Sequence, residues 1–205
     1  MFDHTKYIPF TPIVLPDRSW PDQQIRKAPA WCSVDLRDGN QALINPMGVE
    51  QKMNMFDLLV KIGFKEIEVG FPSASQPDYD FVRKLIDEER IPFDVTIQVL
   101  TQARKELIER TYKALNGVDR AIVHVYNSTS TVQRNQVFTL PPEGIINIAA
   151  QGAKWVKECA MRQPKTDWIF QYSPESFTGT DSSHAIDVCN AVLDEWRPEA
   201  GQKVT

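Results

Sequence analysis

An arginine and an aspartate stand side by side where the first β-rich run of the chain ends. The run of residues 31–36 is followed by Arg37, Asp38 and then Gly39, which turns the chain. Placing two opposite charges at a strand end costs desolvation free energy unless a ligand or a metal ion interacts with them. In parallel α/β proteins, ligands bind at the carboxyl ends of the strands. The pair therefore predicts an enzyme site at this end of the sheet.

Other polar side chains are predicted to lie on the same face, because strand residues alternate between two faces and the aliphatic set should pack against helices. The inward set then comprises Ser33, Asp35, Arg37, Glu66, Glu68, Thr96, Gln98, Leu100, Ile122, His124, Tyr126, Ile169, Gln171, Ser173 and Glu175. A barrel core without a function prefers Val, Ile and Leu at such positions. Carboxylates, an imidazole and a guanidinium that converge in one cavity indicate a site for metal binding and proton transfer.

Three of these charged and polar residues, and two nearby segments, also have a purely structural explanation. Glu68 is as consistent with a buried ion pair as with a site, and a satisfied core histidine is the alternative for His124. Asp38, directly before a glycine, is also typical of a turn. Residues 180–183 are typical of a helix N-cap, and residues 127–130 of either a cap or an anion-binding loop.

Alternating strands and helices must position these residues. The predicted strands are 31–36, 66–69, 94–100, 121–126 and 167–172, and the predicted helices are 48–62, 78–89, 102–115 with Gly117 as its C-cap, 142–161 and 182–196. Strict alternation gives a parallel sheet with right-handed crossovers. Two closures compete, an open doubly wound sheet and a (β/α)₈ barrel, and the lack of a GxGxxG sequence after the first strand counts against a dinucleotide fold.

The length of the chain sets how much of a barrel it supplies. A (β/α)₈ barrel needs eight units and about 250 residues. The 205 residues provide five units, and residues 203–205 resemble the start of a sixth strand. We therefore expect residues 30–205 to be the front part of a longer catalytic barrel.

The bulk composition bounds the class of protein. The chain is 42% hydrophobic and 24% charged, which predicts a folded globular domain. A net charge of −4 argues against a nucleic-acid or anionic-membrane partner. The N-terminus lacks the layout of a signal peptide, and the three cysteines are widely spaced and odd in number. These features predict a cytoplasmic protein.

Residues 1–29 form a separate, proline-rich arm. Its five prolines exclude helix over most of its length. The apolar residues among them predict that the arm lies on a surface, either of its own domain or of a second subunit. His4 in the arm and His184 in the last helix are expected to have no role in a site.

Several segments together resemble 2-isopropylmalate synthases of the long type. They are residues 35–43, 66–75, 124–130 and 171–180, and the resemblance covers essentially the whole chain. The Leu-Arg-Asp-Gly motif is shared with homocitrate synthases, citramalate synthases and 3-hydroxy-3-methylglutaryl-CoA lyase, so alone it indicates only the superfamily. Asn-Gln-Ala-Leu at 40–43 and Tyr-Ser-Pro-Glu-Ser-Phe at 172–177 narrow the resemblance to the synthases.

The resemblance implies a Claisen-type condensation. Acetyl-CoA adds to 3-methyl-2-oxobutanoate, and thioester hydrolysis gives 2-isopropylmalate and CoA in leucine biosynthesis. It also implies a divalent metal ion, Mg²⁺ first and Mn²⁺ or Zn²⁺ as alternatives, that polarises the keto group. A homodimer is implied for the full-length protein.

The resemblance also implies roles for individual residues. Asp38 matches the metal carboxylate, and Arg37 matches a catalytic residue that stabilises negative oxygen as the enolate and alkoxide form. Glu175 matches a catalytic carboxylate near the reacting carbons. Leu100 matches the wall beside the branched tail of the 2-oxo acid. The implied substrate contacts are Arg37, Gln41, Glu68, Leu100, His124 and Ser173.

The sequence departs from the family in one respect that affects activity. The family completes its metal site with a His-x-His motif, and this chain has three histidines and no such motif. We therefore expect the 205-residue chain to have no synthase activity by itself. The alternatives are another enzyme of the same superfamily, and a truncated, non-catalytic module that assembles with a full-length subunit.

Overall fold

A computed structural model of the chain describes residue 16, residues 28–198 and residues 204–205. The chain divides into residues 1–30 and residues 31–205, and the sheet and helices belong to the second unit. The predicted arm of residues 1–29 lies outside the described residues except at positions 16, 28 and 29, and His4 lies outside them as well.

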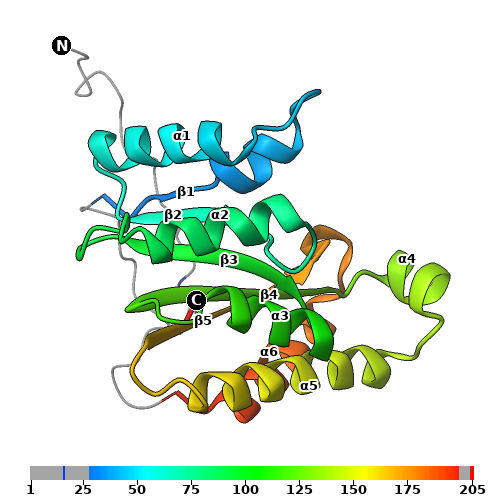
Figure 1. Ribbon diagram of the computed structural model, residues 1–205. Helices are drawn as coiled ribbons and strands as arrows, with labels where there is room; N and C mark the ends of the chain where they lie inside the picture. Colours follow the sequence, from blue (N-terminus) through cyan, green and yellow to red (C-terminus); the bar gives the residue numbers. More distant parts are fainter. Residues whose placement is uncertain (1–15, 17–27, 199–203) are drawn as a thin grey trace. The chain divides into compact units, whose positions relative to one another are not determined.

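Five parallel strands form one sheet in which they lie in chain order (Figure 1). The strands are β1 (Cys32–Ser33), β2 (Glu66–Gly70), β3 (Thr96–Gln102), β4 (Arg120–Ser128) and β5 (Asp167–Glu175). Right-handed crossovers in a sheet whose order never reverses place every connecting helix on the same face. A doubly wound sheet reverses its order and carries helices on both faces. The topology is therefore that of a barrel wall.

The connecting helices follow the order of the strands. They are α1 (Val49–Ile62), α2 (Gln76–Asp87), α3 (Lys105–Ala114), α5 (Pro142–Met161) and α6 (Ser182–Trp196), with a single turn, α4 (Thr131–Gln133), after β4. Each long helix packs on the next, from α1 against α2 to α5 against α6. Helices α1, α2, α3 and α5 follow one another from top to bottom in Figure 1. Helices α5 and α6 begin and end where the sequence predicts. In the part of the chain that the structure describes, no helix is long and apolar enough to cross a membrane.

The last two residues, Val204 and Thr205, lie beside β5. Val204 forms a parallel bridge to Phe170. Thr205 donates its N–H to the carbonyl of Phe170 at 3.2 Å and accepts the N–H of Tyr172 at 3.0 Å. The predicted sixth strand is thus confirmed at its first residues. The unit consists of five βα units of a (β/α)₈ barrel and the beginning of a sixth strand.

The predicted first strand is wrong beyond Ser33. A π-helical turn, η2 (Asp35–Gly39), follows it, and the N–H groups of its last three residues converge on the carbonyl oxygen of Val34 at 2.9–3.2 Å. Leu36 is fully buried, but Val34, predicted to face helices, is 41% exposed, and Asp35 is exposed instead of inward. A helical turn has a period of about 3.6 residues in place of 2, so strand alternation does not apply here.

The predicted third helix, residues 102–115, is longer at both ends than the observed helix α3. Gln102 continues β3, because it pairs with Tyr126 in the ladder and its side-chain amide donates to the Tyr126 hydroxyl at 3.1 Å. Helix α3 therefore starts only at Lys105. Its C-cap is Leu115, and Gly117, predicted to be the cap, takes a left-handed φ of 88° two residues later.

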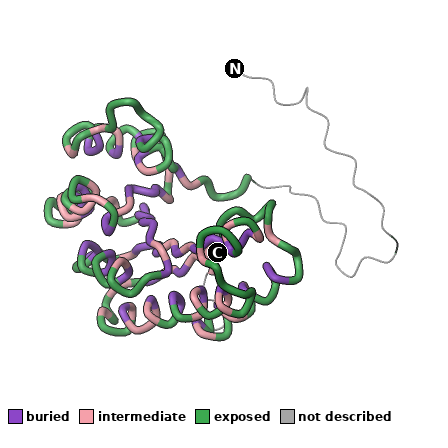
Figure 2. The backbone as a smooth tube through the Cα atoms, turned by 90° about the vertical axis from the view of Figure 1, so that its right-hand side faces the viewer, coloured by how far each residue is buried: buried purple, intermediate pink, exposed green. Residues whose placement is uncertain are grey.

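The core lies between the sheet and the inner faces of the helices. Figure 2 shows the buried backbone gathered in the strands and in the helix turns that face them. Helix α5 lies so close to the residue that follows β3 that only glycine fits at position 152. A Cβ on Gly152 would lie 2.7 Å from the Cβ of Ala103, just after β3, and 3.7 Å from a methyl group of Val125.

Replacing Gly152 by leucine is expected to lower the free energy of unfolding by about 1–3 kcal/mol, since the added carbons have no room in a packed core. Leucine has a higher helix propensity than glycine, so helix formation itself cannot cause the loss. Urea unfolding followed by circular dichroism measures it. Gln151→Leu, at the exposed neighbouring position of the same helix, is the control and should change stability little. An unchanged stability of the Gly152 variant would contradict the close packing.

Candidate active site

A buried carboxylate, Glu68, lies at the centre of a polar cluster at the carboxyl end of the sheet. It sits on β2, and its side chain is 1% exposed. Arg37 donates from Nε to one carboxylate oxygen, and the side-chain amide of Gln98 on β3 donates to the other. Nδ1 of His124 on β4 lies 3.4 Å from that second oxygen. Side chains from three separate segments thus converge on one acid.

His124 extends the cluster to β5. Its Nε2 lies 2.7 Å from the hydroxyl oxygen of Ser173. Leu100 is paired with His124 in the ladder between β3 and β4 and is 9% exposed. An imidazole that is bonded at both nitrogens and flanked by an aliphatic wall has a defined orientation. His124 is therefore a satisfied member of this polar network, bonded at both ring nitrogens.

The surroundings of Glu68 favour its charged form. Burial alone would raise the pKa of this carboxyl, but the hydrogen bonds from His124 and Gln98 and the charge of Arg37 outweigh burial, so its pKa lies below the ordinary value. Glu68 is therefore an anion at neutral pH. The ion-pair explanation left open by the sequence is correct, and the pair also lies inside the cluster.

Arg37 connects the buried acid to an accessible one. From η2 its Nη1 donates to Oδ1 of Asp38 at 2.7 Å, and the side-chain amide of Gln41 donates to the same oxygen at 3.1 Å. The side chain of Asp38 is 55% exposed, whereas that of Arg37 is 18% exposed. The helical turn thus directs Arg37 inward to Glu68 and leaves Asp38 facing solvent.

Glu175 lies outside this bonded network. It ends β5 and is exposed, and its carboxylate accepts the hydroxyl of Ser128 at the end of β4. Strand alternation places Glu175 on the face of Ser173. Of the predicted site residues, the structure joins Arg37, Asp38, Gln41, Glu68, His124 and Ser173 in one network, with Leu100 beside it, and places Glu175 at the rim.

Gln98 is a member of the network that sequence reasoning placed on the inner face without selecting it as a site residue. It pairs with Glu68 in the ladder between β2 and β3, and its amide also lies 3.5 Å from Nδ1 of His124. An amide that lies between a carboxylate and an imidazole fixes the orientation of both side chains. The register of the two strands was the signal that would have identified it.

The cap assignments near the site are partly confirmed. Ser130 accepts the N–H of Gln133 at 3.3 Å, so the segment of residues 127–130 ends in a helix cap. Asp181 occupies the N-cap position of α6, within the predicted cap of residues 180–183, and its side chain makes no capping hydrogen bond. Its carboxylate lies 3.7 Å from Nη2 of Arg134 instead. His184 is buried, and burial together with the charge of Arg134 lowers its pKa.

The described side chains meet the requirements of a divalent metal ion only in part. Asp38 offers a hard carboxylate oxygen of the kind that Mg²⁺ or Mn²⁺ prefers. Within residues 28–198 and 204–205, however, no group of three or more His, Cys, Asp or Glu side chains is placed to hold a metal ion. The described residues therefore do not form a three-ligand metal site by themselves.

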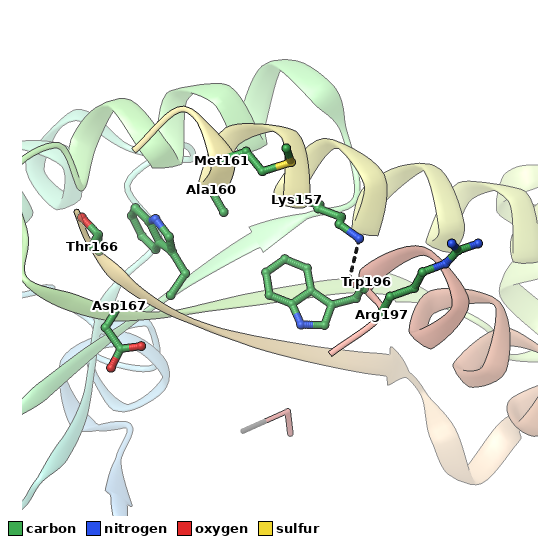
Figure 3. Close-up of a pocket in the computed structure, with 8 residues that line it drawn as sticks. Lys157, Ala160, Met161, Thr166, Asp167, Trp196 and Arg197 are labelled. Carbon is green, nitrogen blue, oxygen red and sulfur yellow. Dashed lines mark hydrogen bonds between the residues drawn. The ribbon is translucent and has the colours of Figure 1, made fainter. Parts of the chain in front are cut away.

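A separate hollow of about 410 Å³ lies at the opposite end of β5 (Figure 3). Asp167, the first residue of β5, lines it together with Trp196 at the end of α6. Nζ of Lys157 donates to the carbonyl oxygens of Glu195 at 3.2 Å and Trp196 at 2.9 Å, and so caps α6. In parallel barrels this end supports stability, and the chemistry lies at the other end.

Comparisons with known proteins agree on one family. The sequence model of the HMGL-like family matches residues 28–195. A protein named 2-isopropylmalate synthase from Alcanivorax borkumensis is 59% identical over 203 residues, which cover 99% of this chain and 36% of the relative. A 2-isopropylmalate synthase from Parafrankia sp. is 61% identical over 194 residues, covering 94% of this chain and 34% of the relative.

The chain thus spans between 34% and 36% of the length of these relatives. Among solved structures, the HMG-CoA lyase from Brucella melitensis is 14% identical with a TM-score of 0.37, covering 84% of this chain and 78% of that chain. A likeness at that TM-score adds nothing to the fold assignment, which follows from the strand order and the family match.

Replacing Glu68 by glutamine is expected to lower the free energy of unfolding at pH 7 by about 2–5 kcal/mol, because Arg37 loses a buried counter-ion. The pKa of Glu68 is lower in the folded than in the unfolded chain. Its stabilising effect is therefore complete above the unfolded-state pKa of about 4.3 and is lost as the pH falls through the folded-state pKa. The variant should consequently lose less stability on acidification than the parent chain.

Urea unfolding between pH 7 and pH 3 measures this difference. Glu106→Gln, an exposed acid on α3, removes the same charge and should leave the acid dependence unchanged. Parallel stability curves for the parent chain and the Glu68 variant would contradict the assignment of Glu68 as a buried anion.

Proposed function

The chain belongs to the HMGL-like family, and on that basis we propose that it is part of a 2-isopropylmalate synthase. This acyltransferase would condense acetyl-CoA with 3-methyl-2-oxobutanoate, and water would then hydrolyse the thioester to give 2-isopropylmalate and CoA. The name shared by relatives with 59% and 61% identity supports the proposal. The observation that carries it is Arg37, which bridges a buried and an exposed carboxylate at the carboxyl end of a parallel sheet.

We assign the stabilisation of negative charge to Arg37. The reaction develops charge first on the enolate oxygen of the thioester and then on the alkoxide of the former keto group. A guanidinium stays protonated at any working pH and holds a fixed fork of donors. Its hydrogen bonds to Glu68 and Asp38 fix its plane before substrate binds, and such preorganised charge is what lowers a barrier.

The 2-oxo acid would lie beside His124 and Ser173. Both carry polar atoms on the inner face, and their mutual hydrogen bond of 2.7 Å keeps them together. Leu100, next to His124 in the ladder, would contact the isopropyl group. Gln41 would contribute a further polar contact through its position beside Asp38. An apolar wall facing polar donors suits a branched 2-oxo acid.

Glu175 would take part in proton transfer at the rim. The condensation needs a base to remove a proton from the acetyl methyl group, and a carboxylate near the reacting carbons can serve. Glu175 is exposed, and its carboxylate accepts a hydrogen bond from the Ser128 hydroxyl. This leaves it accessible to substrate and free of the charge network that holds Glu68.

A divalent metal ion, Mg²⁺ first and Mn²⁺ or Zn²⁺ as alternatives, would be held in part by Asp38. When bound, such an ion supplies Lewis-acid polarisation of the keto group. The other ligands would have to come from parts of the protein that the structure does not describe. For this reason we propose that the 205-residue chain alone is inactive. A homodimer and a cytoplasmic location are proposed for the full-length protein on the family resemblance and the composition.

A chimera tests the function. Residues 1–205 replace the matching segment of the Alcanivorax borkumensis relative, and CoA release is measured with acetyl-CoA and 3-methyl-2-oxobutanoate plus Mg²⁺. The chimera should turn over and should prefer this branched acid to pyruvate or 2-oxoglutarate, while the chain alone should not react. Arg37→Lys, which weakens the stabilisation of transition-state charge, and Asp38→Asn, which removes the proposed metal carboxylate, should each lower kcat/KM by about 10²–10³-fold.

Asp87→Asn, which neutralises an exposed carboxylate on α2, is the matched control and should keep full activity. Preference of the chimera for a different 2-oxo acid would overturn the substrate assignment. Turnover by the 205-residue chain would overturn the proposal that it is inactive alone.

A further inference from the structure

We propose that Lys52 and Asp78 form a positioning pair that holds the end of β2, and with it Glu68, in the orientation that the active site needs. Neither residue belongs to the polar cluster. The proposal rests on the function proposed above only in calling the cluster an active site. Its physical claim is that a buried ion pair behind the sheet controls the geometry of a buried acid within it.

Lys52 is a buried cation in the first turns of α1. Its side chain is 2% exposed, and its Nζ bonds Oδ1 of Asp78, which is 18% exposed, in the first turn of α2. The ammonium group also lies 5.4 Å from the ring centre of Phe81. An ammonium group buried in this way is strongly destabilising unless it is paired. The position of Asp78 is therefore tightly constrained.

Asp78 in turn holds the segment that leaves β2. Its second carboxylate oxygen accepts the backbone N–H of Phe71 at 2.8 Å. Its own N–H donates to the hydroxyl oxygen of Ser75 at 3.2 Å. One residue thus bonds both ends of the connection between β2 and α2. Hydrogen bonds between a charged group and the backbone are among the stronger ones in proteins.

The contact reaches the strand itself at Gly70. A Cβ at this position would lie 3.0 Å from both Cγ and Oδ2 of Asp78, so the carboxyl group packs directly on the backbone. The register of β2 against β3 also shifts between Glu68 and Gly70. Beyond Glu68 the ladder is irregular and specifies the path of the chain less well. The contact with Asp78 supplies the missing constraint.

The cluster is sensitive to that path. Glu68 receives hydrogen bonds from Arg37, Gln98 and His124, each on a different segment. Catalytic groups need to be held within about 0.5 Å of their working geometry. A β2 end that moved by more than this would loosen the donors around the carboxylate. The pair would therefore act on catalysis through Glu68 and without touching substrate.

A purely stabilising role is the alternative, since the pair also joins α1 to α2. The two roles differ in what happens to Glu68 in molecules that remain folded. Its hydrogen bonds lower its pKa, so a loosened cluster raises that pKa. Loss of stability alone changes the fraction of folded molecules and leaves the pKa of Glu68 in them unchanged.

The test is Asp78→Ala in the 205-residue chain, with the Glu68 carboxyl titrated by carbon-13 NMR and its signal assigned through Glu68→Gln. Removing a nearby negative charge would by itself lower the pKa of Glu68. A rise would therefore report lost geometry and not lost charge. We expect a rise in Asp78→Ala and a smaller one in Asp78→Asn, which keeps an oxygen for the N–H of Phe71.

Glu50→Gln is the matched control. It removes the same charge and breaks the exposed pair of Glu50 and Lys84, which joins the same two helices. It should leave the pKa of Glu68 unchanged. If Asp78→Ala does not fold, Asp78→Asn carries the comparison. An unchanged or lowered pKa of Glu68 in the folded Asp78 variant would overturn the proposal. Because the readout is proton affinity, this outcome is independent of whether the chimera is a synthase.

Discussion

A carboxylate that has lost almost all contact with water must be surrounded by donors, and this requirement organises the active end of the sheet. Glu68 is 1% exposed in its side chain. Each of its partners comes from a different part of the chain: Arg37 from a turn, Gln98 from β3 and His124 from β4. Moving any of them would leave a charge unsatisfied in a medium of low dielectric constant. The buried charge therefore orders these side chains before any substrate arrives.

The period of the apolar pattern along the sequence and the register of the strands explain how much of the structure could be predicted. The helices α5 and α6 have long, regular apolar stripes and were predicted to the residue. Alternation within β2, β4 and β5 placed Glu68, His124 and Ser173 on one face, because the opposite face is apolar and a slip of one residue would bury the wrong set. These parts depend on local sequence and on the need to bury apolar area.

The parts that were missed depend on backbone or long-range contacts. The η2 turn arises from three N–H groups that converge on the Val34 carbonyl, and no side-chain pattern marks it. The ends of β4 and β5 extend through polar residues that resemble a loop, because the two strands pair up to Ser128 and Glu175. That pairing also explains why Glu175 bonds Ser128 and not the central network. Such contacts follow only from the relative positions of neighbouring strands.

The chain-order arrangement of the strands also has a consequence for how the molecule assembles during synthesis. Each βα unit can dock on the one made just before it, because neighbouring strands of the sheet are also neighbours in the chain. The acid on β2, however, meets its imidazole only when β4 arrives, 56 residues later. Once β3 has been made, Arg37 and Gln98 can already bond the carboxylate, and only the donor from β4 is missing. The arrival of β4 then adds the imidazole and completes the set of side chains around the acid.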